Sequence, residues 1–206
     1  DNSWSQAWTL GGPEGTPCAK NVRMAKSMAP AIDGVRHEPA VPDSDDQVIV
    51  HAQVLDTGSI SQVAVVYRGL NPVSIPVKKA LTDSGQVKDG APRDGHYAVR
   101  LPRLPPGTLI GFYVLARDSS GRVTRFPEGE EECLFQVEGR EKPPQGLPGM
   151  PVYRILMPPE RWSAFVGAPK RADTWFPCTF VASIEGPGVN ERNGTAFYGS
   201  SIRYRG

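Results

Sequence analysis

Short runs of alternating apolar and polar residues recur between residues 32 and 137, and they constrain the fold more than any other feature. Between Val48 and Val54, four apolar side chains fall on alternate positions and so share one face. This period of two is typical of a half-buried strand. No helical stripe of useful length interrupts the pattern, and turn signals separate the runs. The chain, with 22 Gly and 21 Pro, is therefore predicted to be all-β and rich in turns.

The predicted strands of this unit cover residues 32–37, 48–54, 63–67, 73–77, 97–101, 108–116 and 134–137. About seven strands in roughly 105 residues is typical of an immunoglobulin-like or fibronectin-III-like β-sandwich. Pro76 confines its segment to a sheet edge because proline cannot donate a ladder hydrogen bond. In residues 97–101 we expect Ala98 to face away from the core, and we expect His51 to face solvent.

Three further segments flank this unit. Residues 1–31 are expected to be the exit strand and connector of an upstream domain, and residues 138–150 form a linker rich in Pro and Gly. Residues 151–206 begin another unit, with strands at 152–157, 178–184 and 196–204 and a short helix at 158–166. About 55 residues with so few elements make a marginal core. We therefore predict a truncated α+β segment whose core includes Trp162 and Trp175, and a chain that is a piece of a longer protein.

The charge and cysteine content of the chain exclude several classes of function. With 23 basic and 22 acidic residues, the chain has no strong field to attract nucleic acid or a membrane surface. No apolar run approaches the ~20 residues of a membrane span, and the chain does not open on a signal-peptide pattern. Cys18, Cys133 and Cys178 match neither a disulfide framework nor a metal-site spacing. We expect unpaired thiols, and one long-range bridge remains an alternative in a secreted protein.

Three aspartate-containing turns are packed into residues 83–95. Asp83 precedes Ser-Gly, and Asp89 and Asp94 each precede Gly. Such pairs mark tight turns, because Gly adopts positive φ easily and Asp bonds to its own backbone. Carboxylate oxygens are also the ligands that Ca²⁺ prefers. Asp83, Asp89 and Asp94 are therefore a candidate calcium site, although their spacing differs from the EF-hand loop, and solvated turns are the alternative interpretation.

Other candidate sites are weaker. Asp residues at 43, 45 and 46, with Asp56 and Asp118 at other turns, could form a second cation site at one end of the sandwich. The three His residues show no paired metal spacing, and neither a nucleophile elbow nor a glycine-rich phosphate loop occurs. Asn193 opens a formal glycosylation sequon that also reads as a hairpin turn.

Several segments resemble known families. Residues 83–102 followed by 107–121 resemble a β-sandwich module that precedes kinase-like domains in secreted bacterial multidomain proteins. Residues 151–157, 179–181 and 202–206 resemble the opening of the CotH-type spore-coat protein kinase family. Residues 8–17 are similar to the last strand and exit of a lamin-tail-like domain.

The resemblance implies an atypical kinase that uses ATP and a divalent metal, with its active-site residues beyond the matched strand. Arg203 and Arg205 match only the strand leading to that site, so we expect this chain not to be an enzyme on its own. The predicted function is a non-catalytic spacer or interaction module, extracellular or at the cell surface, whose partners are neighbouring domains or other surface proteins. The alternatives are a segment of a CotH-like extracellular kinase and a carbohydrate-binding module.

Overall fold

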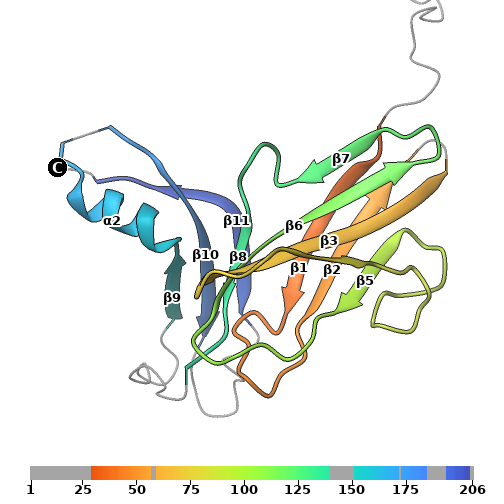
Figure 1. The fold of residues 1–206 in the computed structure, drawn as a ribbon, viewed down its shortest axis with the longest axis horizontal. Helices are drawn as coiled ribbons and strands as arrows, with labels where there is room; N and C mark the ends of the chain where they lie inside the picture. Colours follow the sequence, from red (N-terminus) through yellow and green to blue (C-terminus); the bar gives the residue numbers. More distant parts are fainter. Residues whose placement is uncertain (1–28, 57–58, 140–150, 172, 185–193, 205–206) are drawn as a thin grey trace, which may run out of the picture.

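The computed structural model describes residues 29–56, 59–139, 151–171, 173–184 and 194–204, which form antiparallel strands and one short helix (Figure 1). The elements are β1 (Ala31–Glu38), β2 (Ile49–Leu55), β3 (Ile60–Asn71), β4 (Val77–Ala80), β5 (His96–Arg100), β6 (Leu109–Asp118), β7 (Val123–Phe126), β8 (Cys133–Gln136), β9 (Pro151–Leu156), α2 (Pro159–Gly167), β10 (Phe176–Ile184) and β11 (Thr195–Ile202).

The first eight strands form two facing sheets. One sheet has the order β1-β2-β5, and the other has the order β4-β3-β6-β7, with β8 also pairing with β6. All of these pairs are antiparallel. The predicted all-β sandwich is therefore confirmed.

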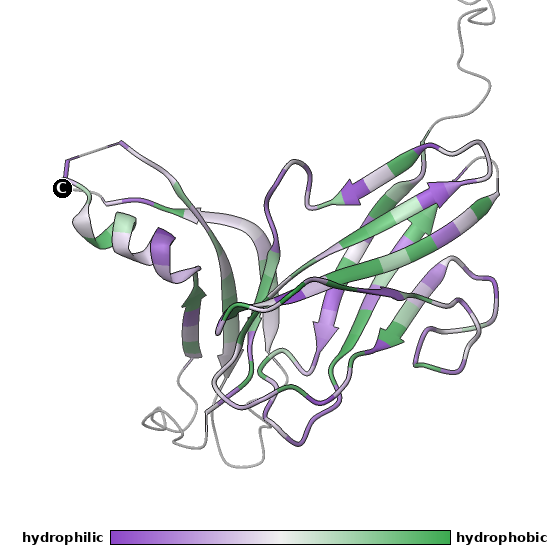
Figure 2. Cartoon of the chain, in the orientation of Figure 1, coloured by the Kyte–Doolittle hydropathy of each residue, from purple (hydrophilic) through white to green (hydrophobic). Residues whose placement is uncertain are grey.

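The core lies between these two sheets and follows the sequence alternation. Phe112 and Phe135 are fully buried at its centre, and Figure 2 shows the long hydrophobic stretches of β2 and β3 that contribute to it. The buried members of this core are Val48, Val50, Ala52, Val54, Val63, Val65, Tyr67, Leu81, Val99, Leu101, Ile110, Phe112, Val114, Ala116, Cys133, Phe135 and Val137.

A third sheet of order β11-β10-β9 follows, with α2 between β9 and β10. The helix was predicted, but none of its residues is buried. Phe165 contacts the rings of Phe176 and Tyr204. Trp162 and Trp175 are 49% and 55% exposed, so the prediction that they are core residues is wrong for the described part of the chain. The helix packs through Phe165, which leaves both indoles at the surface.

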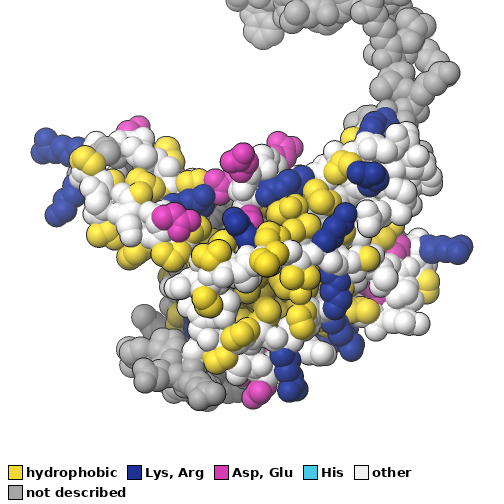
Figure 3. All heavy atoms as spheres, viewed as in Figure 1, with side chains coloured by type: hydrophobic (Ala, Val, Ile, Leu, Met, Phe, Trp, Pro, Cys, Tyr) yellow, Lys and Arg dark blue, Asp and Glu magenta, His cyan; other side chains and the backbone are white. Residues whose placement is uncertain are grey.

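Two strand assignments differ from the sequence prediction. Strand β7 was missed because its four residues are only half-buried or exposed and show no clear apolar alternation. Strand β4 begins at Val77, after Pro76, whereas Val73 and Ile75 before it are 80% and 85% exposed. Figure 3 shows hydrophobic side chains reaching the surface in the middle of this face, over β3 and the chain that leads to β4.

The outward-facing side of the β1-β2-β5 sheet is more buried than expected. Ala98 is fully buried because the chain leaving β4 pairs with β5 there, through reciprocal backbone hydrogen bonds between Thr82 and Ala98. His51 is only 4% exposed because its Nε2 lies 3.6 Å from Glu38 on β1, with Lys88 and Asp89 also nearby. Ala98 lies on the face opposite the core residues Val99 and Leu101, as predicted, whereas the prediction that His51 faces solvent is wrong.

Replacing Phe112 tests the central position of this ring. We expect Phe112→Ala to lower the free energy of unfolding by about 3–5 kcal/mol, because a fully buried aromatic side chain leaves a cavity. The exposed Val123→Ala is the matched control and should cost less than about 0.5 kcal/mol. Urea denaturation of both variants measures the difference, and equal stabilities would contradict the assigned core.

Candidate functional site

Asp83 binds the C-terminal end of the aspartate-rich loop between β4 and β5. Its two carboxylate oxygens accept hydrogen bonds from the backbone N–H groups of Arg93, Asp94 and Gly95 at 2.6, 3.3 and 3.0 Å. One carboxylate thus closes three consecutive peptide groups into a turn. This is the local bonding that the Asp-Gly pattern predicts.

Asp94 shapes the same turn from its other side. Its oxygens accept hydrogen bonds from the backbone N–H groups of His96 and Ala91, each at 2.9 Å. The His96 N–H bond is the main cause that holds the pKa of Asp94 below its ordinary value. The carboxylate therefore keeps its charge as a backbone acceptor.

Asp89 is the buried member of the loop. Its carboxylate accepts backbone N–H bonds from Ser84 at 2.7 Å, Gly85 at 3.0 Å and Val87 at 2.9 Å. Burial raises the pKa of Asp89, but these bonds outweigh burial, and the pKa lies below its usual range. A charged acceptor at the centre of three donors fixes the loop.

The structure brings the three aspartates together within one loop, and all six of their carboxylate oxygens accept backbone N–H groups. Turn formation accounts for each of them. In the described residues, no group of three or more His, Cys, Asp and Glu side chains is arranged to hold a metal ion. The calcium site at Asp83, Asp89 and Asp94 stays a prediction, which a thermal midpoint raised by Ca²⁺ and restored by EGTA would support.

The second candidate cation site is not assembled. The aspartates at 43, 45 and 46 precede β2, and Asp56 follows it, so the length of that strand separates them. Asp118, at the end of β6, bonds to Ser120 and to Arg122. Burial raises the pKa of Asp118, but Ser120 and Arg122 lower it to about 2. This carboxylate closes the turn between β6 and β7.

Two of the three cysteines lie in the described residues. Cys133 and Cys178 are buried free thiols, as expected, and burial raises the pKa of each. Both are therefore poor nucleophiles. Cys18, Asn193 and Arg205 lie outside the described residues.

The more extensive candidate site is the contact between the sandwich and the third sheet, called the junction below. Its apolar centre joins Leu109 of β6 and Leu134 of β8 to Leu156 of β9 and Val181 of β10. At the same place, the Leu134 backbone N–H donates to Thr179 Oγ1 at 3.0 Å, and that bond is buried. Each fully buried Leu or Val contributes about 1.5–3 kcal/mol, so this contact is a stable one.

A buried histidine and a partly buried tyrosine form the second part of the junction. His37 of β1 bonds through Nδ1 to the Tyr198 hydroxyl of β11, and its Nε2 lies 3.1 Å from the Ala40 carbonyl oxygen. Burial raises the pKa of Tyr198 well above its ordinary value, so the hydroxyl keeps its proton and donates it. Burial lowers the pKa of His37 to about 4. The ring is thus neutral and donates through Nε2 to the carbonyl.

Ion pairs flank the junction on two sides. Arg161 of α2 pairs with Glu131 at 3.1 Å and donates to the Pro177 carbonyl oxygen at 3.1 Å. Arg154 of β9 pairs with Glu138 at 3.5 Å. Both acids belong to the segments that flank β8, so each pair ties the third sheet to the sandwich.

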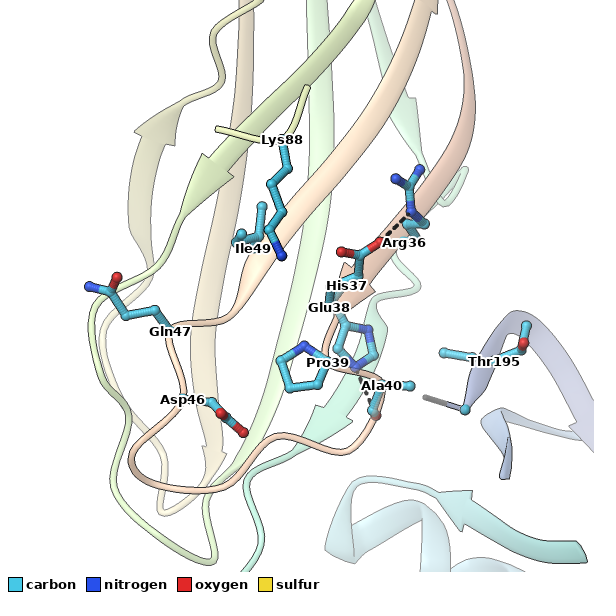
Figure 4. A pocket seen from close by; sticks show the side chains of 12 residues that line it. Arg36, His37, Glu38, Pro39, Ala40, Asp46, Gln47, Ile49, Lys88 and Thr195 are labelled. Atoms are coloured by element: carbon cyan, nitrogen blue, oxygen red, sulfur yellow. Dashed lines mark hydrogen bonds and ion pairs between the residues drawn. The ribbon is translucent and has the colours of Figure 1, made fainter. Parts of the chain in front are cut away.

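A cleft of about 590 Å³ opens beside the junction (Figure 4). The end of β1, the start of β2 and the start of β11 line it, and Lys88 reaches over it from the aspartate-rich loop. Glu38 pairs there with Arg36 at 3.1 Å. Arg36, Lys88, Glu38 and Asp46 give the cleft charges of both signs.

Sequence reasoning missed His37, Thr179 and Tyr198. His37 was judged only for paired metal spacing, and its actual partner is 161 residues away in the chain. The available signal was Thr179, one of two polar residues in the mainly apolar strand Phe176–Ile184.

Arg203, which the family resemblance singled out, directly follows β11. It pairs with Asp173, and its guanidinium lies 4.5 Å from the centre of the Trp175 ring. These contacts hold the chain after β11 against the segment before β10.

Comparison with known proteins adds no assignment: no protein-family model matches the chain, and no curated protein matches it. Among the described residues, no helix is long and apolar enough to span a bilayer.

Asp89 is expected to stabilise the loop without any metal. In EGTA, Asp89→Ala should lower the free energy of unfolding by about 2–3 kcal/mol, because three peptide N–H groups lose a charged acceptor. Asp45→Ala, in another loop and exposed, should change it by less than about 0.5 kcal/mol. Chemical denaturation measures both, and a loss that appears only when Ca²⁺ is present would instead assign Asp89 to a metal.

His37 is expected to make the fold sensitive to acid. Its pKa is about 4 in the folded chain and 6.5 in the unfolded chain, so the unfolded state binds more protons between these values. Neutral His37 therefore contributes to the free energy of unfolding in full above pH 6.5. This contribution, roughly 3 kcal/mol in all, is lost as the pH falls toward 4.

Stability curves at several pH values for wild type and His37→Gln test this expectation. The variant should be less stable at pH 7, and its stability should fall less steeply between pH 6.5 and 4. Parallel curves would show that other groups cause the acid sensitivity.

Proposed function

We propose that the chain is a non-catalytic β-sandwich module that holds a second β-unit in a fixed orientation. The observation that carries this proposal is the junction, where apolar packing, one buried and one partly buried hydrogen bond, and two ion pairs act on one contact. A unit joined by a linker alone needs none of these. Domains are mobile relative to one another unless their interface is large and apolar.

The division into a three-stranded and a larger sheet supports a fibronectin-III-like identity for the sandwich. The proposed setting is a secreted or cell-surface bacterial multidomain protein, as the family resemblance implies. If the C-terminal unit belongs to a CotH-like kinase domain, the sandwich positions that domain. The chain itself is then expected to show no phosphoryl transfer.

Spin-label distances test the fixed orientation. Labels at Ser119→Cys on the sandwich and Ala164→Cys on α2, in a Cys18→Ser background, should give one narrow distance distribution, because both positions are exposed and the native thiols are buried. Val181→Asp places a carboxylate in the apolar centre of the junction and should broaden the distribution.

Ile155→Asp is the matched control, since it lies on the opposite, exposed face of the same sheet. It should leave the distribution narrow. A broad distribution in the wild-type background would overturn the proposed function.

A further inference from the structure

The cleft beside the junction combines apolar walls with charged side chains. Ile49 and Ala40, each 7% exposed, contribute to the apolar part together with Pro39. The cleft volume of about 590 Å³ lies within the range of roughly 300–1,000 Å³ that is usual for small-molecule sites. Such sites occur preferentially where two packed units meet, and here β11 of the third sheet supplies one wall. The cleft therefore has the size and position of a ligand site.

Arg36 and Glu38 keep bonding groups free on one side of the cleft. Arg36 Nε donates to Glu38 Oε1 at 3.1 Å, and within the described part of the chain the two Nη atoms of Arg36 have no partner. Glu38 Oε2 lies 3.6 Å from the buried His51 Nε2, too far for a hydrogen bond, and that nitrogen has no hydrogen-bond partner among the described residues. Burial raises the pKa of Glu38, but the bond from Arg36 and the nearby charges outweigh burial, so the carboxylate stays ionised.

Lys88 is held over the same side of the cleft by the aspartate-rich loop. Figure 4 shows its side chain extending past Ile49 toward Glu38. The backbone φ of Lys88 is +56°, a left-handed conformation that residues with a Cβ rarely adopt. The Asp89 carboxylate fixes this part of the loop by accepting the Val87 N–H at 2.9 Å. No acid of the described residues pairs with the Lys88 ammonium. A solvated surface lysine needs no such conformation.

These three side chains match the head group of an α-amino acid, which carries a carboxylate and an ammonium on one carbon atom. The forked donor of Arg36 and the ammonium of Lys88 suit the carboxylate. Glu38 Oε2 suits the ammonium. A ligand with only a negative charge would meet the charge of Glu38, and a ligand with only a positive charge would meet Arg36 and Lys88. A head group with both charges avoids either repulsion.

We propose that the cleft binds a free α-amino acid, whose carboxylate is held by Arg36 and Lys88 and whose ammonium is held by Glu38. The ligand side chain then lies along Ile49 toward Asp46, at the end of the cleft opposite Arg36 (Figure 4). Asp46 disfavours an acidic side chain there, so a long neutral or basic side chain fits best. This inference goes beyond the proposed function, because it assigns a ligand to the cleft.

A ligand-observed NMR screen of the full chain against each common amino acid tests the inference. We expect at least one amino acid with a long neutral or basic side chain to bind. Its carboxamide, which lacks the carboxylate, and its N-acetyl form, which lacks the ammonium, should each bind about tenfold or more weakly in a calorimetric titration.

Two variants assign the head group to its partners. Lys88→Asn removes the positive charge and keeps a residue that tolerates the left-handed backbone. It should weaken binding of the free amino acid about tenfold, while the thermal midpoint of the ligand-free chain stays the same or rises. Glu38→Gln should weaken binding of the free amino acid about tenfold but leave binding of the N-acetyl form nearly unchanged. Lys78→Gln, an exposed lysine of β4, is the matched control and should bind within about twofold of wild type.

The inference is overturned if no amino acid binds, if the carboxamide binds as tightly as the free acid, or if binding survives both Lys88→Asn and Glu38→Gln. A lower thermal midpoint of ligand-free Lys88→Asn, with unchanged affinity, would assign Lys88 to the fold of the loop and overturn the inference as well. The spin-label distances are measured without ligand, so the proposed function and this inference can fail separately.

Discussion

Strand β8 is buried on both of its faces, and the position of the third sheet depends on this. Cys133, Phe135 and Val137 point into the sandwich core, whereas Leu134 points the other way into the apolar centre of the junction. A strand covered on one side only would leave Leu134 in water. Since β8 is fixed to β6 by its backbone ladder, whatever packs on Leu134 is fixed as well.

The polar groups at the junction have hydrogen-bond partners because the packing around Leu134 shields them from water. The Leu134 N–H group is shielded from water and needs an acceptor, which Thr179 supplies from the third sheet. His37 is likewise cut off from solvent and is satisfied by one partner from each side. Apolar contact thus brings the units together, and the hydrogen bonds define how they are aligned.

The alternation of apolar and polar residues was sufficient to predict most of the strands and the sandwich. Alternation identified β2, β3 and β6 because one face of each lies on a large core. It failed for β7, whose side chains are hardly buried, and for the exposure of His51, which is covered by segments that come from elsewhere in the chain. Burial of that kind depends on tertiary contacts that a period of two does not encode.

The candidate sites divide in the same way. The aspartates of the loop between β4 and β5 were found from sequence because their bonds are to residues at most twelve positions away. The junction was not found, since its pairs join positions 16 to 161 residues apart. The exposed aliphatic residues before β4 were taken for part of a strand, and only their exposure in the folded chain separates them from the core.

The two buried thiols give the molecule a pair of internal reporters. Cys133 lies in the sandwich core, and Cys178 lies in the third sheet beside Arg161 of α2. Neither can be alkylated while its surroundings stay closed, so each one records the opening of its own unit. Modification of Cys178 at a rate faster than that of Cys133 would describe a chain whose C-terminal unit opens while the sandwich stays folded.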